Sequence, residues 1–175
     1  MGTAIFKRLK KVEMECYLFD RFYRFQKVFG IADLPHHIIY EGEVTNIYLT
    51  HRLRDHQTRN LRNISQIQAV SMYIRPDTKV NVELLHRLKN PHLILAGLTP
   101  ENGGLRIITS VSTKEIFSDP QDKYHYCYNS VLSFYKSNYD IPTPKSSSTD
   151  ILGCVGQLHP DYFIDNTAAF QPLIC

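Results

Sequence analysis

Histidine is the residue type here with the widest chemical range, because its ring serves as acid, base or metal ligand near neutral pH. The chain has eight histidines. Catalytic zinc sites take three protein ligands, often with two on one helical turn, yet neither HExxH nor HxH occurs in the sequence. His36 and His37 are adjacent, so on a strand they would point to opposite faces. The sequence therefore predicts no metal site and no cofactor.

Motifs for nucleophilic catalysis or nucleotide binding are also missing. Cys127 lies two positions after His125, but sequence neighbours rarely form a catalytic dyad. The chain has no GxSxG elbow and no GxGxxG fingerprint, and no Lys-Ser/Thr pair follows Gly103 and Gly104. Acid–base pairs need no motif. A phosphodiester or nucleotide hydrolase that uses His and carboxylates therefore stays the competing class, with no catalytic residue assigned.

Two clusters of basic residues are the remaining candidates, and both suit anion binding. Each Lys or Arg near an anionic leaflet contributes about 1 kcal/mol, and the planar fork of Arg fits phosphate oxygens. The candidate anion-binding residues are Lys7, Arg8, Lys10, Lys11, Arg52, Arg54, Arg59 and Arg62. They predict contact with an acidic lipid surface, a nucleoprotein or RNA. An RNA-binding regulator is a second alternative, although no RNP1, KH or zinc-finger pattern supports it.

Charge is divided unevenly along the chain. Residues 1–106 have 16 Lys/Arg against 10 Asp/Glu, a balance of +6, whereas residues 107–175 have 4 against 7, a balance of −3. Patches of opposite sign steer association between molecules. The division is typical of a basic interaction face, and it also fits the predicted homo-oligomer, whose copies could meet head to tail.

Composition and cysteine use predict the compartment. The hydrophobic fraction of 43% and the charged fraction of 21% are ordinary for a globular protein. The four cysteines are scattered, no uninterrupted apolar segment follows the basic start as in a secretory signal, and no run of 18 apolar residues spans a membrane. We expect an intracellular protein, cytoplasmic or nuclear, that associates at most peripherally with a membrane.

The basic N-terminal cluster opens a pattern that predicts a long helix over residues 4–29. Apolar residues recur there with spacings of 4, 3, 4, 3 and 4, at Ile5, Leu9, Val12, Cys16, Phe19 and Tyr23. Gly30 supplies a C-terminal cap and Pro35 prevents continuation. A second stripe places Phe22 and Phe25 beside the first, so these phenylalanines and Phe19 are predicted core residues.

The rest of the chain predicts hairpins and shorter helices. Expected elements are a hairpin over 36–51, a helix over 60–74, a short helix capped by Asn81 that stops before Pro91, a hairpin that joins strands 92–98 and 105–112, and a helix over 124–137. The predicted organisation is a globular domain over 1–140, a Pro/Ser-rich linker over 141–150, and an extended C-terminal arm over 151–175 that packs on its own domain or a neighbouring copy.

These patterns predict a fold class and a general function. The fold is expected to be α+β: a single compact domain with a long N-terminal helix, antiparallel hairpins and the C-terminal arm. In size, mild basicity and N-terminal cations the chain is similar in general character to small viral matrix proteins, without a shared motif. The expected function is a non-enzymatic structural or assembly protein that self-associates and contacts an anionic partner.

Overall fold

The fold is rich in β-sheet. The computed structural model describes residues 14–55, 60–145 and 155–175. Strands take 33% and helices 27%, and most sheet pairings are antiparallel. The predicted α+β fold built on a long N-terminal helix is wrong, because residues 15–30 form two paired strands in place of the second half of that helix.

Strands β1 (Glu15–Phe19) and β2 (Phe25–Gly30) form the first hairpin. They are antiparallel, with Cys16 opposite Phe29. Spacings of three and four also occur by chance in a segment dense in Tyr, Phe and Val, and these residue types favour strands. Phe19 is buried as predicted, at 2% exposure, but Phe22 at the hairpin tip is 62% exposed, so the prediction for Phe22 is wrong. Phe25 is partly buried against the core.

The segment after β2 does not form the predicted hairpin over 36–51. It contains a 3-10 turn η1 (Ile31–Asp33), helix α1 (Leu34–Ile38) and strand β3 (Asn46–Tyr48). Pro35 lies in the first turn of α1, where its missing N–H costs no hydrogen bond. Strand β3 pairs with β1, so the first sheet has the order β2-β1-β3.

The helix predicted over 60–74 is also wrong. The structure has a 3-10 turn η2 (Leu61–Asn63), strand β5 (Ile64–Ile67) and strand β6 (Ala69–Ile74). Strand β4 (His51–Leu53) pairs with β5 as a small two-stranded sheet. Strand β6 pairs with a long central strand over its whole length, and such tertiary pairing overrides a helical spacing of apolar residues.

The central sheet carries most of the core. It is built around β7 (Leu93–Leu98) and β8 (Leu105–Ser112), the hairpin predicted from the sequence, which the structure confirms. Strand β6 also pairs with β8. All residues of β7 are buried, as expected for a strand that is covered on both faces.

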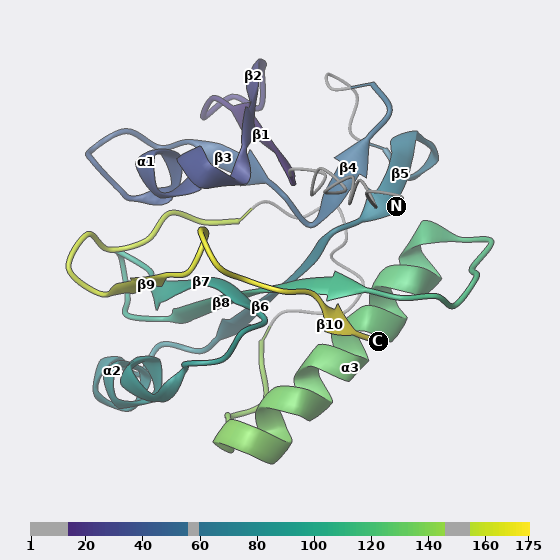
Figure 1. The fold of residues 1–175 in the computed structure, drawn as a ribbon. Helices are drawn as coiled ribbons and strands as arrows, with labels where there is room; N and C mark the ends of the chain where they lie inside the picture. The colour runs from purple at the N-terminus through teal and green to yellow at the C-terminus, as the bar shows by residue number, and fades with distance from the viewer. Residues whose placement is uncertain (1–13, 56–59, 146–154) are drawn as a thin grey trace, which may run out of the picture.

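Helices α2 (Thr78–Arg87) and α3 (Pro120–Tyr139) confirm the two later helix predictions. The carboxylate of Asp77, rather than Asn81, caps α2 by accepting from the Val80 N–H at 3.2 Å. Asn81 is fully buried instead, and its amide donates to two backbone carbonyls. Helix α3 packs against β5, β6 and β8 (Figure 1).

The C-terminal segment, residues 155–175, packs on the rest of the chain. Val155 and Leu158 bridge to the first sheet and to the end of α1. Strand β9 (Phe163–Asp165) then pairs with β7, and β10 (Leu173–Ile174) pairs in parallel with β8 (Figure 1). Half of the predicted linker, residues 146–150, lies outside the described residues, and Ile141 at its start is buried.

Candidate functional site

The tip of the β1–β2 hairpin is held in place by one carboxylate. Asp20 accepts hydrogen bonds from the backbone N–H groups of Phe22 and Arg24, at 2.9 and 3.0 Å, and from the Arg24 guanidinium at 2.7 Å. Tyr23 has a positive φ of 61°, which lets the chain reverse within this short turn. The Arg24 N–H is the main reason that the pKa of Asp20 lies below its ordinary value. The tip is therefore a defined turn.

This turn presents an aromatic ring flanked by cations. Phe22 is 62% exposed, and the guanidinium carbons of Arg21 and Arg24 lie 4.7 and 5.4 Å from its ring centroid. These distances are within the range of cation–π attraction. Tyr23 beside it is 55% exposed. Planar cations next to an exposed ring suit a ligand that has both flat apolar faces and negative charges.

A groove lies between the hairpin tip and the segment before β3. We call it the hairpin groove, and it has a volume of about 860 Å³. Its lining residues are Leu18, Phe19, Asp20, Arg21, Phe22, Arg24, Gln26, Lys27, Gly42, Glu43, Val44 and Thr45. Val44, in the segment before β3, is 58% exposed. Three cations face two carboxylates in this lining, and one of those carboxylates, Asp20, is used to hold the turn.

The structure brings together two of the predicted anion-binding residues on the neighbouring β4–β5 hairpin. The Arg54 guanidinium donates to the backbone carbonyl of Arg62 at 2.9 Å, and both side chains are exposed. Arg52 differs, because its guanidinium donates to the carboxylate of Glu15 at 2.7 Å and is partly withdrawn from solvent. Lys7, Arg8, Lys10, Lys11 and Arg59 lie outside the described residues.

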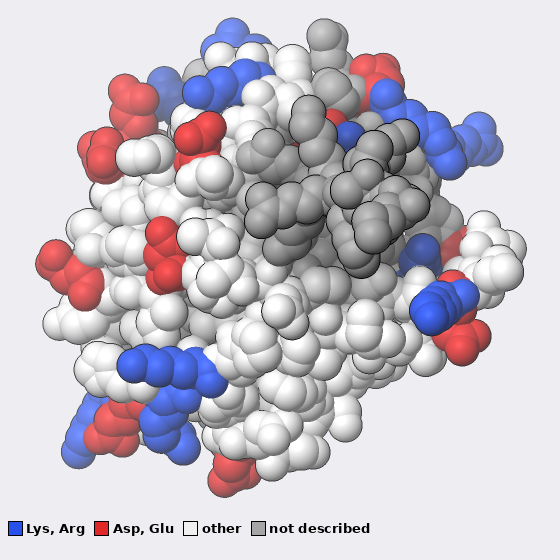
Figure 2. Space-filling view, viewed as in Figure 1, with Lys and Arg blue, Asp and Glu red and all other residues white. Residues whose placement is uncertain are grey.

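Both hairpins point to the same end of the molecule, above the central sheet (Figure 1). Figure 2 shows Lys and Arg side chains over β1 and β2 and beside β4 and β5 at this end. The view also has a separate basic group near α2. The described cations of the two hairpins thus share one side of the fold.

Sequence analysis missed Arg21, Phe22 and Arg24 because it assigned them to a helix. A usable signal was present: the run Asp20-Arg-Phe-Tyr-Arg24 places an acid before alternating cations and aromatics. Asp accepts hydrogen bonds from backbone N–H groups two residues further on, which favours a turn over a helix interior.

The residues considered for catalysis do not converge. No group of three or more His, Cys, Asp or Glu side chains in the described parts of the chain is placed to hold a metal ion. Cys127 on α3 is buried, and a hydrogen bond with Cys175, followed by burial, raises the pKa of its thiol far above the ordinary value. His51 is buried, with its Nδ1 2.9 Å from the Thr50 hydroxyl. The Cys127 thiol is thus held protonated, which is opposite to what a nucleophile requires.

Comparison with known proteins adds no assignment. The chain matches no protein-family model, no curated protein and no solved structure. Among the residues that the structure describes, no helix combines the length and apolar character that crossing a membrane requires.

Proposed function

We propose that this protein is a non-enzymatic assembly protein that contacts single-stranded RNA, bare or within a nucleoprotein, through the hairpin groove. The observation that carries the proposal is the exposed Phe22 ring with the Arg21 and Arg24 guanidinia beside it. Stacking of a base on an aromatic side chain contributes about 1–3 kcal/mol. The neighbouring guanidinia are suited to the phosphates that flank the stacked base.

Single-stranded RNA fits this surface better than a duplex does. The faces of paired bases are hidden in their stack, and sequence-specific RNA contacts go mostly to unpaired bases that stack on aromatic rings. Phe22 and Val44 both line the groove and offer it exposed apolar surface. Arg54 and Arg62 on the β4–β5 hairpin extend the cationic surface along the same end, where the strand would continue.

Self-association belongs to the same proposal. Strand β2 ends the first sheet, and among the described strands it pairs only with β1. Such an edge presents unpaired backbone N–H and C=O groups that pair readily with another chain. Two copies joined through parallel pairing of their β2 strands would bring two hairpin tips close together, so that neighbouring copies would bind one RNA strand cooperatively.

The test is fluorescence anisotropy with a labelled single-stranded RNA, comparing the wild type with Phe22→Ala. Loss of one stacked base should weaken binding by roughly 5- to 150-fold. Ile116→Ala is the matched control, because Ile116 is 96% exposed and does not line the groove. Equal binding by wild type and Phe22→Ala would refute the proposal. Vesicles of phosphatidylserine form a second arm, and Phe22-dependent binding to them but not to RNA would assign the groove to a membrane surface.

A further inference from the structure

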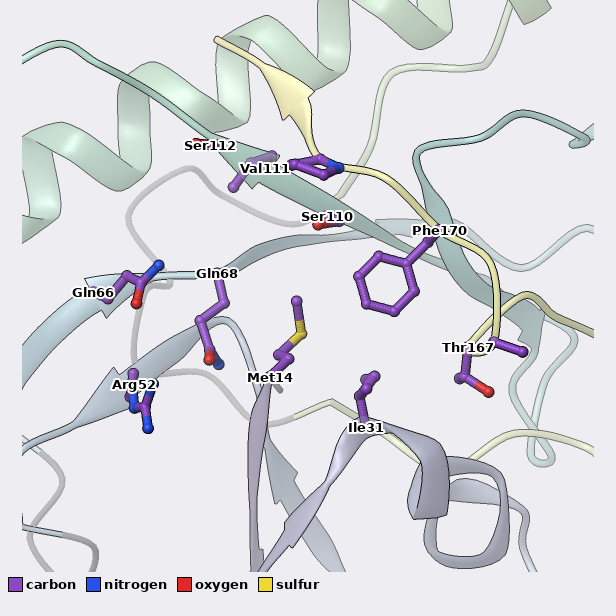
Figure 3. A pocket seen from close by; sticks show the side chains of 12 residues that line it. Met14, Ile31, Arg52, Gln66, Gln68, Ser110, Val111, Ser112, Thr167 and Phe170 are labelled. Carbon is purple, nitrogen blue, oxygen red and sulfur yellow. The ribbon is translucent and has the colours of Figure 1, made fainter. Parts of the chain in front are cut away.

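A second hollow lies inside the fold, between the first sheet, the β4–β5 hairpin, β8 and the C-terminal segment. We call it the inter-sheet cavity, and its volume is about 480 Å³. Figure 3 shows Met14 and Ile31 pointing into it from one side and Phe170 from another, with Gln66, Gln68 and Arg52 across from the phenylalanine. None of its lining residues lines the hairpin groove, so the two hollows are separate sites.

One wall of the cavity is polar and preorganised. Glu15 holds the Arg52 guanidinium through an N–O distance of 2.7 Å, and the same carboxylate accepts from the Tyr17 hydroxyl at 2.8 Å. The Tyr17 oxygen in turn accepts from the Leu53 N–H at 2.8 Å. This chain of hydrogen bonds fixes the direction of Arg52, whose side chain lines the cavity and is still 32% exposed.

Further hydrogen-bonding groups surround Arg52. Gln68 is committed to the fold, since its amide nitrogen donates to the carbonyls of Glu15 and Leu49 and its oxygen accepts from the Glu15 N–H. Gln66 and Ser112 are exposed at the rim, so their amide and hydroxyl remain accessible. A side-chain amide is suited to a base edge because it donates and accepts side by side.

The lining restricts the class of ligand. An entirely apolar ligand would cover the Arg52 guanidinium and the Gln66 amide and offer them no hydrogen bond in place of water, which is costly. A metal ion is unsuited, because none of the lining residues is a carboxylate, thiol or imidazole. A polyphosphate is unsuited as well, since Arg52 is the one cation in the lining and several phosphates would need more. A ligand with a flat apolar face, hydrogen-bonding edges and one small anionic group fits all parts of the wall.

We propose that the inter-sheet cavity binds a nucleoside monophosphate. The base lies against the apolar wall that includes Met14 and Ile31, its edge meets the Gln66 amide, and the phosphate meets Arg52 and the Ser112 hydroxyl. A volume of about 480 Å³ falls within the range of pockets that hold ligands of this size. This site goes beyond the RNA-binding function proposed above and does not depend on it.

Isothermal titration calorimetry on the full chain tests the proposal, with adenosine monophosphate, adenosine and inorganic phosphate as separate probes. The monophosphate should bind more tightly than either fragment. Gln66→Leu should weaken it roughly tenfold by removing the edge contact. Ala168→Trp, at an exposed lining position, should abolish binding by filling the cavity. Gln26→Leu is the control, because Gln26 lines only the hairpin groove and should change nothing.

Two results would overturn the proposal. One is the absence of heat with adenosine monophosphate at millimolar concentration, and the other is equal affinity for adenosine and its monophosphate. Thermal melts of Gln66→Leu and Ala168→Trp establish that each variant is folded. RNA anisotropy on the same variants separates the two sites. The cavity variants should bind RNA as the wild type does, whether or not the cavity binds adenosine monophosphate.

Discussion

The β7–β8 hairpin and the β1–β2 hairpin are the same kind of element with opposite surroundings. In the turn between β7 and β8, the Thr99 N–H donates to the Gly104 carbonyl at 2.7 Å, and the Thr99 hydroxyl donates to the Asn102 side-chain oxygen at 2.7 Å. Every residue of β7 is buried. In the β1–β2 hairpin, the turn is equally well bonded through Asp20, but it holds Phe22 and Tyr23 out in solvent.

The two hairpins differ in whether their apolar side chains are buried, so we expect one to contribute mainly to stability and the other mainly to binding. Apolar side chains of β7 and β8 face the core, where each contributes to the free energy of unfolding. At the β1–β2 tip, an ordered turn keeps the rings of Phe22 and Tyr23 mostly exposed, so these rings add little to the free energy of unfolding. Under the proposed function, the partner that would cover this surface is RNA. Substitutions in the β7–β8 hairpin should therefore change the free energy of unfolding, whereas substitutions at the β1–β2 tip should change RNA binding.

The largest effect is expected in the core hairpin. Ile107 on β8 is fully buried, so Ile107→Ala should lower the free energy of unfolding by about 2–5 kcal/mol. Phe22→Ala at the other tip should change it by less than about 0.5 kcal/mol, as surface substitutions do. Urea unfolding measures both. A large loss of stability in Phe22→Ala would show that the tip is packed and would remove the distinction between the hairpins.

Two glycines give a smaller effect that sharpens the same comparison. Gly103, in the β7–β8 turn, has a φ of +70°, and an added Cβ would lie 3.1 Å from the Thr78 Cβ and closer still to its hydroxyl. Gly103→Ala should therefore cost more than about 1 kcal/mol of stability. Gly42, beside the hairpin groove, has a φ of +97° but open space around it, so Gly42→Ala meets backbone strain alone. In thermal melts, Gly103→Ala should have a lower melting temperature than Gly42→Ala. The reverse order would contradict the close packing of Gly103 against Thr78.

Cations at the exposed tip should act on binding rather than on folding. Arg21→Gln and Lys27→Gln each remove a charge from the hairpin groove. Each should weaken RNA binding and reduce the slope of log affinity against log salt by about 1 if it contacts a phosphate. Anisotropy titrations between roughly 50 and 200 mM salt measure the slope. Lys79→Gln on α2 serves as the control, and an equal change there would indicate a non-specific charge effect.

The sequence predicted the second half of the fold better than the first. The β7–β8 hairpin was predictable because Pro91, Pro100 and the Gly103-Gly104 pair delimit its apolar strands. Helix α3 was predictable from the spacing of Tyr124, Val131 and Tyr135. In residues 60–74, apolar spacings satisfied a helix as well as a strand, and the pairing of β6 with β8 that decides between them joins segments far apart in sequence. In residues 15–30 the pairing of β1 with β2 is local, and the helix prediction failed because the turn at Asp20 was missed.

The candidate site was predicted only in part. The sequence identified Arg54 and Arg62 as cations, and the structure places them together through the carbonyl of Arg62. It also selected Arg52, but the partner Glu15 is 37 residues away along the chain, and no local pattern shows such a contact. Phe22 was assigned to the core because exposure depends on where the turn falls, and the turn was missed.

The smallest predicted effect concerns the pH dependence of the exposed tip. The pKa of Asp20 is lowered in the folded state, chiefly by the Arg24 backbone N–H. At a pH between the folded-state pKa of Asp20 and the ordinary Asp pKa, the unfolded chain binds more protons than the folded chain. The stabilisation of the fold by ionised Asp20 is therefore fully present above the ordinary Asp pKa. It is lost as the pH falls through the folded-state pKa. Amide hydrogen exchange at Phe22 and Arg24 should accelerate in that acidic range relative to the Thr99–Gly104 turn, whose bonds involve no ionised side chain. Asp20→Asn should remove the pH dependence, whereas Asp165→Asn, at a carboxylate in β9, should retain it. A pH dependence that persists in Asp20→Asn would mean that another group holds the tip.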